Sequence, residues 1–225
     1  MSQNLFKRIL TSIILLILFI IINFSHQYIF ILSILILGII ICIEANNMFS
    51  KLFNNESTSL KKFNFKLFIL NLITFCYIFF IFCNFSYEIY KLQSSVFFLY
   101  LISICFFSDI GGYIFGKTIG GKKLSKISPN KTISGTIGSF IFSIIPLYLI
   151  LNLGYLDLEF NLKYITFSLL VSLISQLGDL FVSYFKRKAK IKDTGKILPG
   201  HGGVLDRVDG IIFAVPFSYL LIKII

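Results

Sequence analysis

The stretch "SSVFFLYLISICFFS" at residues 94–108 decides the fold class, because it leads directly into a segment that otherwise suggests a soluble nucleotide-binding protein. That segment, "GGYIFGKT" at residues 111–118, fits the phosphate-binding loop pattern G-x-x-x-x-G-K-[ST]. In a P-loop protein the pattern follows a buried strand and begins a helix. Residues 94–108 instead form an apolar run that reads as a membrane span, and no alternation of strands and helices follows. A P-loop fold is therefore not predicted.

The composition of the whole chain is that of a membrane protein. Of its 225 residues, 56% are hydrophobic and only 14% are charged, whereas about a quarter of a typical soluble domain is charged. Apolar runs recur, several slightly shorter than the roughly 20 residues that cross a bilayer. We predict an all-α polytopic integral membrane protein with about seven transmembrane helices and with cytoplasmic loops that form the site. The predicted spans are Ile9–Asn23, Tyr28–Ile43, Leu67–Cys83, Ser94–Phe107, Ile137–Leu153, Tyr164–Phe185 and Ile211–Ile225.

The distribution of lysine and arginine predicts the orientation. Residues 1–8, 46–66, 109–136 and 186–209 hold 2, 4, 5 and 7 basic residues, and only Lys91, Lys163 and Lys223 lie elsewhere. Basic loops face the cytoplasm, so these segments, with the N-terminus, are predicted to be cytoplasmic in a protein of the cell's inner membrane. The same asymmetry accounts for the net charge of +11 without a nucleic-acid partner. No small-residue cleavage site follows the first run, so a retained helical hairpin is expected rather than a signal peptide.

The four cysteines lie inside apolar runs. Cys42, Cys76, Cys83 and Cys105 show no C-x-x-C spacing. They are therefore expected to be small buried hydrophobes and not zinc ligands or disulfides.

Residues 109–136 are unusual for a simple connection. Asp109 is followed by five glycines interleaved with lysines, and the segment closes with "SPNKT" at Ser128–Thr132. Glycines let the backbone approach a ligand closely, and lysines and hydroxyls suit phosphate oxygens. A basic loop lying against anionic lipid explains the same composition. The segment alone does not decide between these readings.

A carboxylate lies inside a later apolar run. Ser175, Asp179 and Ser183 are spaced four residues apart in "SLISQLGDLFVSYFKRK", so they share one helix face. A carboxylate at the centre of a membrane helix costs about 2.5–3.5 kcal/mol and by default suggests function. The alternative is a hydrogen bond that only packs two helices together.

The segment "KRKAKIKDTGKILPGHGGVLDRVDG" at Lys186–Gly210 places three aspartates among many cations. Asp206 and Asp209 share a face if this stretch begins the last helix, and two such carboxylates suit a hard divalent ion. They suit the N-terminus of that helix equally well. His201, between glycines, is a candidate phosphate contact or a turn residue.

Half of the ten acidic residues thus fall beside the basic segments of the predicted cytoplasmic face. They are Asp109, Asp179, Asp193, Asp206 and Asp209. Carboxylates that face cations and glycines are what a Mg²⁺–polyphosphate site needs, because the metal bridges phosphates to carboxylates and lysines neutralise the remaining charge.

At these residues the chain resembles the phosphatidate cytidylyltransferases, also called CDP-diacylglycerol synthases. The family signature begins with S-x-x-K-R, four further residues and K-D. A stretch ending in H-G-G follows, and then a hydrophobic residue, any one residue, D-R, a hydrophobic residue and D. Every fixed position is matched within "SYFKRKAKIKDTGKILPGHGGVLDRVD": Ser183, Lys186, Arg187, Lys192, Asp193, His201, Gly202, Gly203, Asp206, Arg207 and Asp209. "QLGDL" at Gln176–Leu180 and "SPNKT" also look like the family's elements. In two respects the chain departs: Ser134 stands where the family usually has Glu, and the chain is short for the family.

The resemblance implies a reaction in which CTP and phosphatidate give CDP-diacylglycerol and pyrophosphate. The implied catalytic residues are Asp179, Asp206, Asp209, Lys192 and Asp193. The implied substrate-binding residues are Lys131, Thr132, Ser183, Lys186, Arg187, His201, Gly202, Gly203 and Arg207. Metal ligands are expected at Asp179, Asp206, Asp209 and Asp109, with Mg²⁺ the primary metal and a second cation left open. Residues 1–93 are predicted to form an N-terminal transmembrane region and residues 94–225 a catalytic region with the signature at 183–209.

Two other functions compete with this one. A CTP-dependent polyprenol kinase would also place a Mg²⁺–nucleotide site on cytoplasmic loops, but it would transfer the γ-phosphoryl group and release CDP. A cation transporter using Asp179 would need polar residues along several spans, whereas the acids here crowd one surface. The expected partners are CTP, phosphatidate and the lipid bilayer, with a homodimer left open and no nucleic acid.

Overall fold

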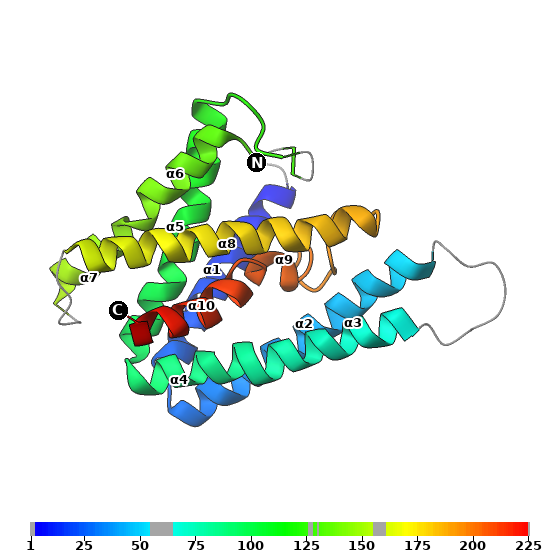
Figure 1. The fold of residues 1–225 in the computed structure, drawn as a ribbon, viewed down its shortest axis with the longest axis horizontal. Helices are drawn as coiled ribbons and strands as arrows, with labels where there is room; N and C mark the ends of the chain where they lie inside the picture. The colour runs from blue at the N-terminus through cyan, green and yellow to red at the C-terminus, as the bar shows by residue number, and fades with distance from the viewer. Residues whose placement is uncertain (1–2, 55–64, 126–127, 130, 155–160, 225) are drawn as a thin grey trace. The chain divides into compact units, whose positions relative to one another are not determined.

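The computed structural model describes residues 3–54, 65–125, 128–129, 131–154 and 161–224. Across these ranges the chain is helical, and its only β-type contacts are two isolated bridges, Lys123 with Thr132 and Leu198 with Gly202 (Figure 1). The predicted all-α class is therefore confirmed. Part of the predicted connection at 46–66, and Asn130 of the "SPNKT" element, lie outside the described residues.

The chain forms two compact units that interleave along the sequence. The first unit contains Met1–Tyr87 and Tyr184–Asp209, and the second contains Glu88–Ser183 and Gly210–Ile225. Residues Tyr184–Asp209, which are all of the signature segment except Ser183, thus pack in the same unit as the N-terminal helices. The predicted division of the chain into an N-terminal region, residues 1–93, and a catalytic region, residues 94–225, stays a prediction.

The first unit is built on long apolar helices. Its helices are α1 (Gln3–Asn23), α2 (Gln27–Asn54), α3 (Phe65–Cys76), the π-helical η1 (Tyr77–Cys83), the start of α4 (Asn84–Leu92) and the short α9 (Leu205–Val208). Helix α2 lies along α3 and η1 (Figure 1). This contact is close because Gly38 has no side chain: a Cβ there would lie 3.0 Å from Ile78 Cγ2 and 3.1 Å from Cys83 Sγ. Phe30, Ile41 and Phe82 form part of the buried core of this unit.

The second unit contains α5 (Ser95–Thr118), α6 (Ile133–Ser143), α7 (Ile145–Leu153), α8 (Leu162–Lys188, up to Ser183) and α10 (Ile211–Ile224). Side chains cap two of these helices: Ser94 Oγ accepts a hydrogen bond from Phe97 N, and Thr132 Oγ1 accepts one from Gly135 N. Buried hydroxyl groups link α5 to α8. The Tyr100 hydroxyl is hydrogen-bonded to Ser168 Oγ at 2.8 Å. These bonds satisfy polar groups that lie deep in apolar surroundings.

The structure corrects the prediction of a glycine-rich loop from residue 109. Helix α5 continues through the whole P-loop-like segment and ends only at Thr118. Its glycines pack against α6 instead of surrounding a phosphate: a Cβ at Gly111 would lie 2.6 Å from Phe142 Cβ, and one at Gly112 would lie 2.6 Å from Ser139 Oγ. Small residues allow close helix contacts in membranes. The loop proper begins after Thr118, where Gly120 and Gly121 have positive φ angles.

Replacement of Gly111 by alanine tests this packing. We expect Gly111→Ala to destabilise the protein by about 1–3 kcal/mol, because the new methyl group enters the space of Phe142 in a filled interface. Gly116→Ala is the matched control, since its Cβ would meet no atom closer than Thr132 Oγ1 at 3.2 Å and alanine favours a helix. Unfolding midpoints in detergent measure both. Equal midpoints for Gly111→Ala and the unchanged protein would contradict the packing.

Five helical stretches are long and apolar enough to cross a membrane among the described residues. They are Gln27–Phe53, Phe65–Leu92, Ser95–Thr118, Ile133–Leu153 and Leu162–Lys188. The first predicted span corresponds to the shorter apolar stretch Leu10–Asn23 in α1, and the last corresponds to the 14 residues of α10. The chain is thus a multi-pass helical membrane protein, and the number seven stays a prediction.

Candidate active site

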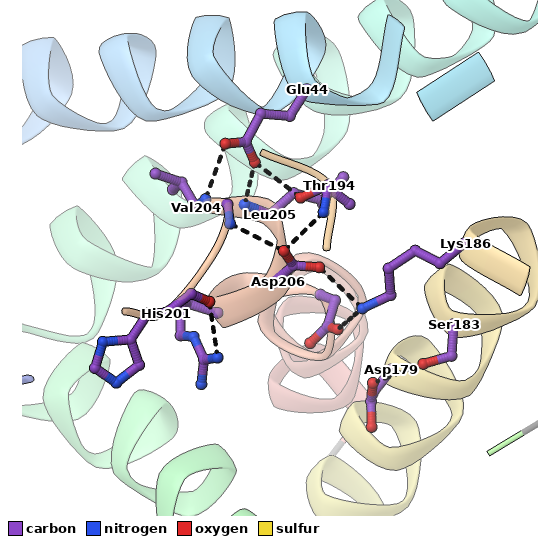
Figure 2. A network of polar contacts seen from close by, with 12 residues as sticks. Glu44, Asp179, Ser183, Lys186, Thr194, His201, Val204, Leu205 and Asp206 are labelled. Carbon is purple, nitrogen blue, oxygen red and sulfur yellow. Dashed lines mark hydrogen bonds and ion pairs between the residues drawn. The ribbon is translucent and has the colours of Figure 1, made fainter. Parts of the chain in front are cut away.

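A buried lysine pairs with two aspartates of the signature. Lys186 lies near the end of α8, and its side chain is 10% exposed. Its Nζ is 2.9 Å from Asp206 Oδ1 and 3.8 Å from Asp209 Oδ2 (Figure 2). Buried charges are stable only when they are paired or hydrogen-bonded. The structure therefore brings these three signature residues together in one ion-paired group.

The second oxygen of Asp206 is held by the backbone. Asp206 Oδ2 accepts hydrogen bonds from Thr194 N at 2.8 Å and from Gly203 N at 3.0 Å. The carboxylate therefore has donors on both sides and one defined orientation, with Oδ1 directed at Lys186. The stretch does not begin the last helix, the condition given for a shared helix face: Asp206 lies in the short α9, Asp209 follows it, and α10 begins only at Ile211. Both carboxylates nevertheless lie near Lys186 Nζ.

The loop between Lys186 and Asp206 is built from tight turns. Gly202 N and His201 N both donate to Leu198 O, which closes the turn at Pro199 and Gly200. Gly200 and Gly202 have φ angles of +78° and +90°, a region that strains any residue with a side chain. Gly200 and the first glycine of the H-G-G motif, Gly202, are thus needed for the shape of the loop, whatever ligand it binds.

His201 lies against helix α1. Thr11 Oγ1 is 2.6 Å from its Nδ1, and Ser12 Oγ is 3.2 Å from its Nε2. The backbone oxygen of His201 also accepts a hydrogen bond from the Arg207 guanidinium at 3.1 Å. The ring is therefore held by hydroxyls, and its predicted contact with a phosphate stays a prediction.

Cationic side chains near this network are exposed. Arg187, Lys192 and Arg207 are open to solvent, as is Asp193. Their exposure leaves them accessible to an anionic ligand, whereas Lys186 is less exposed and already paired with two aspartates.

The second unit brings together two residues that were predicted separately. Lys131 forms an ion pair with Asp179, whose Oδ1 also accepts a hydrogen bond from Ser183 Oγ at 3.3 Å. The lysine and aspartate side chains are 29% and 27% exposed, so the pair is accessible from solvent. The predicted shared face of Asp179 and Ser183 is thus confirmed. Asp109 is exposed on α5.

The loop that carries Lys131 is well tethered despite the unusual Ser134. Leu124 N donates to Lys131 O at 2.8 Å, and Ile133 N donates to Lys122 O at 3.0 Å. Ser134 Oγ donates to Gly120 O and lies 2.9 Å from Thr132 Oγ1. The serine therefore joins both ends of the loop at the position where the family that the sequence resembles usually has glutamate.

One residue of the network around Lys186 and Asp206 was not predicted from the sequence. Glu44 of α2 is 2% exposed, and its carboxylate accepts three hydrogen bonds from residues 194–205 (Figure 2). The available signal was its position, since an ionisable residue directly after the apolar run Tyr28–Ile43 is unusual in a membrane helix.

Two carboxylates of the first unit suit a metal that is shared with a phosphate. Within the described ranges, no three His, Cys, Asp or Glu side chains gather closely enough to hold an ion by themselves. Mg²⁺ is commonly bound by only one or two carboxylates together with substrate phosphates. Asp206 and Asp209 provide such a pair, and Asp206 Oδ1 keeps acceptor capacity beyond its bond to Lys186. The residues present therefore fit Mg²⁺ bound jointly with a ligand.

The fold and the paired charges define a class: a multi-pass helical membrane protein with an acidic and basic site at the end of a long helix. The chain belongs to the cytidylyltransferase family, whose model matches residues 50–225, which is more than half of the chain. The matched region contains the whole signature segment at residues 183–209.

Curated relatives carry the name phosphatidate cytidylyltransferase. A protein of that name from Staphylococcus haemolyticus is 44% identical over 127 residues, and one from Staphylococcus aureus strain COL is 46% identical over 127 residues; each alignment covers 55% of this chain and 48% of the relative. One from Helicobacter pylori strain J99 is 39% identical over 137 residues, which cover 60% of this chain and 50% of the relative. The chain thus spans about half the length of the curated relatives it matches.

Proposed function

We propose that the chain transfers the cytidylyl group of CTP to phosphatidate, producing CDP-diacylglycerol and pyrophosphate for phospholipid biosynthesis. The observation that supports this most is the pairing of Lys186 with Asp206 and Asp209, because it joins two ends of the family signature in one charged network. The names of the relatives point to the same reaction.

The reaction needs positioning and charge neutralisation more than proton transfer. A phosphate oxygen of phosphatidate is already ionised and forms a bond to the α-phosphorus of CTP, while the bond from that phosphorus to the bridging oxygen breaks and pyrophosphate leaves. No histidine base is required for this attack, so His201 is assigned to binding. Binding both substrates in one orientation supplies much of the rate enhancement, and cations directed at developing negative charge supply more.

The cations of the chain are the proposed phosphate ligands. In the first unit, Lys186, Arg187, Lys192 and Arg207 would bind the phosphates, and Gly202 and Gly203 would let the backbone approach them. In the second unit, Lys131 and Thr132 would do the same, with Ser183 orienting Asp179 through their hydrogen bond. Asp193 would orient neighbouring lysines.

Mg²⁺ is the proposed metal. Asp206 and Asp209 would hold it, and Asp179 and Asp109 remain predicted ligands of this or a second cation. When bound, the ion neutralises phosphate charge and polarises the phosphorus that is attacked.

The proposed setting is the inner membrane of the cell. By the positive-inside rule, the basic loops would place the N-terminus on the cytoplasmic side. The group around Lys186 and Asp206 and the Lys131–Asp179 pair would lie on that side as well. Seven spans would then include α1 and α10 in addition to the five long stretches. A homodimer is compatible with this arrangement.

An assay of the purified chain tests the proposal. Protein in detergent with CTP, Mg²⁺ and phosphatidate is expected to form a lipid-linked cytidine product and an equal amount of pyrophosphate, and EDTA is expected to stop both. A kinase would release CDP instead. Pyrophosphate release that does not depend on phosphatidate, or the absence of any lipid product, would contradict the assignment.

A further inference from the structure

We propose that Glu44 is a positioning residue of this site: its buried carboxylate holds residues 194–205 in the conformation in which Asp206 faces Lys186. The inference deepens the proposed function and rests on it for the activity part of its test. Glu44 precedes the region that the family model matches, which begins at residue 50. The match to the family model therefore assigns it no role.

The environment of Glu44 explains why its carboxylate is stable inside a membrane helix. It lies in the candidate span Gln27–Phe53 and is 2% exposed. Its Oε1 accepts a hydrogen bond from Val204 N at 3.0 Å, and its Oε2 accepts bonds from Leu205 N at 2.8 Å and Thr194 Oγ1 at 3.1 Å. A buried carboxylate is tolerated when donors surround it in this way.

All three donors belong to the loop that carries the signature. Glu44 and Asp206 hold this loop from opposite sides (Figure 2). Thr194 donates its N–H to Asp206 and its hydroxyl to Glu44. The next two backbone donors also go to different carboxylates: Gly203 N donates to Asp206, and Val204 N donates to Glu44. The orientation of Asp206 therefore depends on a loop that Glu44 fixes.

Two glycines of the loop leave room for the Glu44 side chain. A Cβ at Gly203 would lie 2.5 Å from Glu44 Oε2 and 2.7 Å from Gly195 N. A Cβ at Gly195 would lie 2.9 Å from Glu44 Cδ. The second glycine of the H-G-G motif thus has a specific purpose in this chain, because any larger residue would displace the carboxylate.

Glu44→Gln is the sharpest test, because it keeps the size of the side chain and changes only its acceptors. An amide has one oxygen and one NH₂ group. In either orientation the NH₂ group faces a backbone N–H, that of Val204 or that of Leu205, so one of these donors loses its partner. We expect amide hydrogen exchange of residues 203–206 to become about 10-fold faster or more, while α5 and α6 keep their protection.

The activity of the same variant separates positioning from simple binding. We expect kcat to fall by about 10- to 100-fold, because a small misplacement of Asp206 disturbs the reacting geometry. The KM for CTP is expected to change by less than about threefold, since the exposed cations still bind phosphate. Glu88→Gln, the same chemical change on α4, is the matched control and is expected to leave exchange and kinetics unchanged.

A second variant keeps the proposal testable if Glu44→Gln does not fold. Thr194→Val removes only the hydroxyl donor at a residue that is 3% exposed. We expect a smaller change in the same direction, because the loop loses only one of the three hydrogen bonds that Glu44 accepts, while those from Val204 N and Leu205 N remain. Exchange at residues 203–206 that stays as slow as in the unchanged protein would contradict the proposal.

The outcomes also separate this inference from the proposed function. If exchange at residues 203–206 stays as slow as in the unchanged protein, Glu44 does not hold the loop, whatever happens to activity. If exchange rises but the unchanged protein makes no CDP-diacylglycerol, the loop contact stands and the reaction assigned to the chain is wrong. If exchange rises and kcat is unaffected, Glu44 stabilises the loop without positioning Asp206, and the inference fails.

Discussion

Asp206→Asn is expected to reduce turnover by about 100- to 1000-fold. A loss of this size is typical when one group of a site that stabilises transition-state charge is removed. Asp206 is the centre of the first network, where its two oxygens receive Lys186, Thr194 and Gly203. Asparagine keeps the shape but has only one acceptor oxygen. That oxygen serves the two backbone donors best, which leaves an NH₂ group facing the Lys186 ammonium.

The fold is expected to survive this change. Both backbone bonds to the loop remain available, and Lys186 still has Asp209 Oδ2 at 3.8 Å. The measurement is cytidine incorporation into lipid at saturating CTP and phosphatidate, with the elution volume and unfolding midpoint as checks of folding. Glu88→Gln serves again as a neutral charge-removing control. If Asp206→Asn turned over at the rate of the unchanged protein, Asp206 would have no part in metal or phosphate binding.

The hydrophobic pattern predicted the helices better than it predicted where they end. The apolar run ending at Phe107 identified α5 correctly, but the helix continues to Thr118 through three glycines. Glycine disfavours a helix in water, which is why the sequence indicated a loop. In this unit the glycines are retained because α6 lies so close that a Cβ at Gly111 would meet Phe142. A helix partner at that distance is tertiary information, which the local sequence does not contain.

The site shows the same division between local and long-range information. The aspartates and lysines of residues 183–209 were identified from their spacing and their resemblance to a signature, and the structure brings Lys186, Asp206 and Asp209 together. Lys131 and Asp179 were each named, but their ion pair was not foreseen because it joins a loop to a distant helix. Glu44 was passed over for a related reason: its donors come from a loop about 150 residues further along the chain.

Removal of the buried charge at Lys186 is expected to damage stability and activity together. Lys186→Met leaves Asp206 and Asp209 close to each other without their shared cation, in a place where the three side chains are 10%, 5% and 13% exposed. Breaking a buried pair by removing one partner costs about 3–5 kcal/mol. The unfolding midpoint is therefore expected to fall by several degrees, and CDP-diacylglycerol formation is expected to be lost.

A matched variant distinguishes burial from the simple loss of a positive charge. Lys188 lies in the same last turn of α8, but it is exposed, with its Nζ 4.7 Å from the centre of the Tyr184 ring. Lys188→Met removes the same charge and only a cation–π contact of about 0.5–1 kcal/mol. We expect its unfolding midpoint to stay close to that of the unchanged protein. A drop as large as that of Lys186→Met would mean that total charge, and not the buried pair, determines stability.

The double variant Lys186→Met with Asp206→Asn separates the two roles of the lysine. Asparagine removes the carboxylate that Lys186→Met leaves unpaired, so the second substitution is expected to recover much of the lost stability. Catalysis is not expected to recover in this way, because in the proposed reaction Lys186 binds phosphate and Asp206 holds Mg²⁺, and the double variant restores neither role. The expected result is an unfolding midpoint above that of Lys186→Met and a turnover no higher. If the double variant regained activity along with stability, Lys186 would be a structural counter-ion of Asp206 and would have no direct part in binding CTP or phosphatidate.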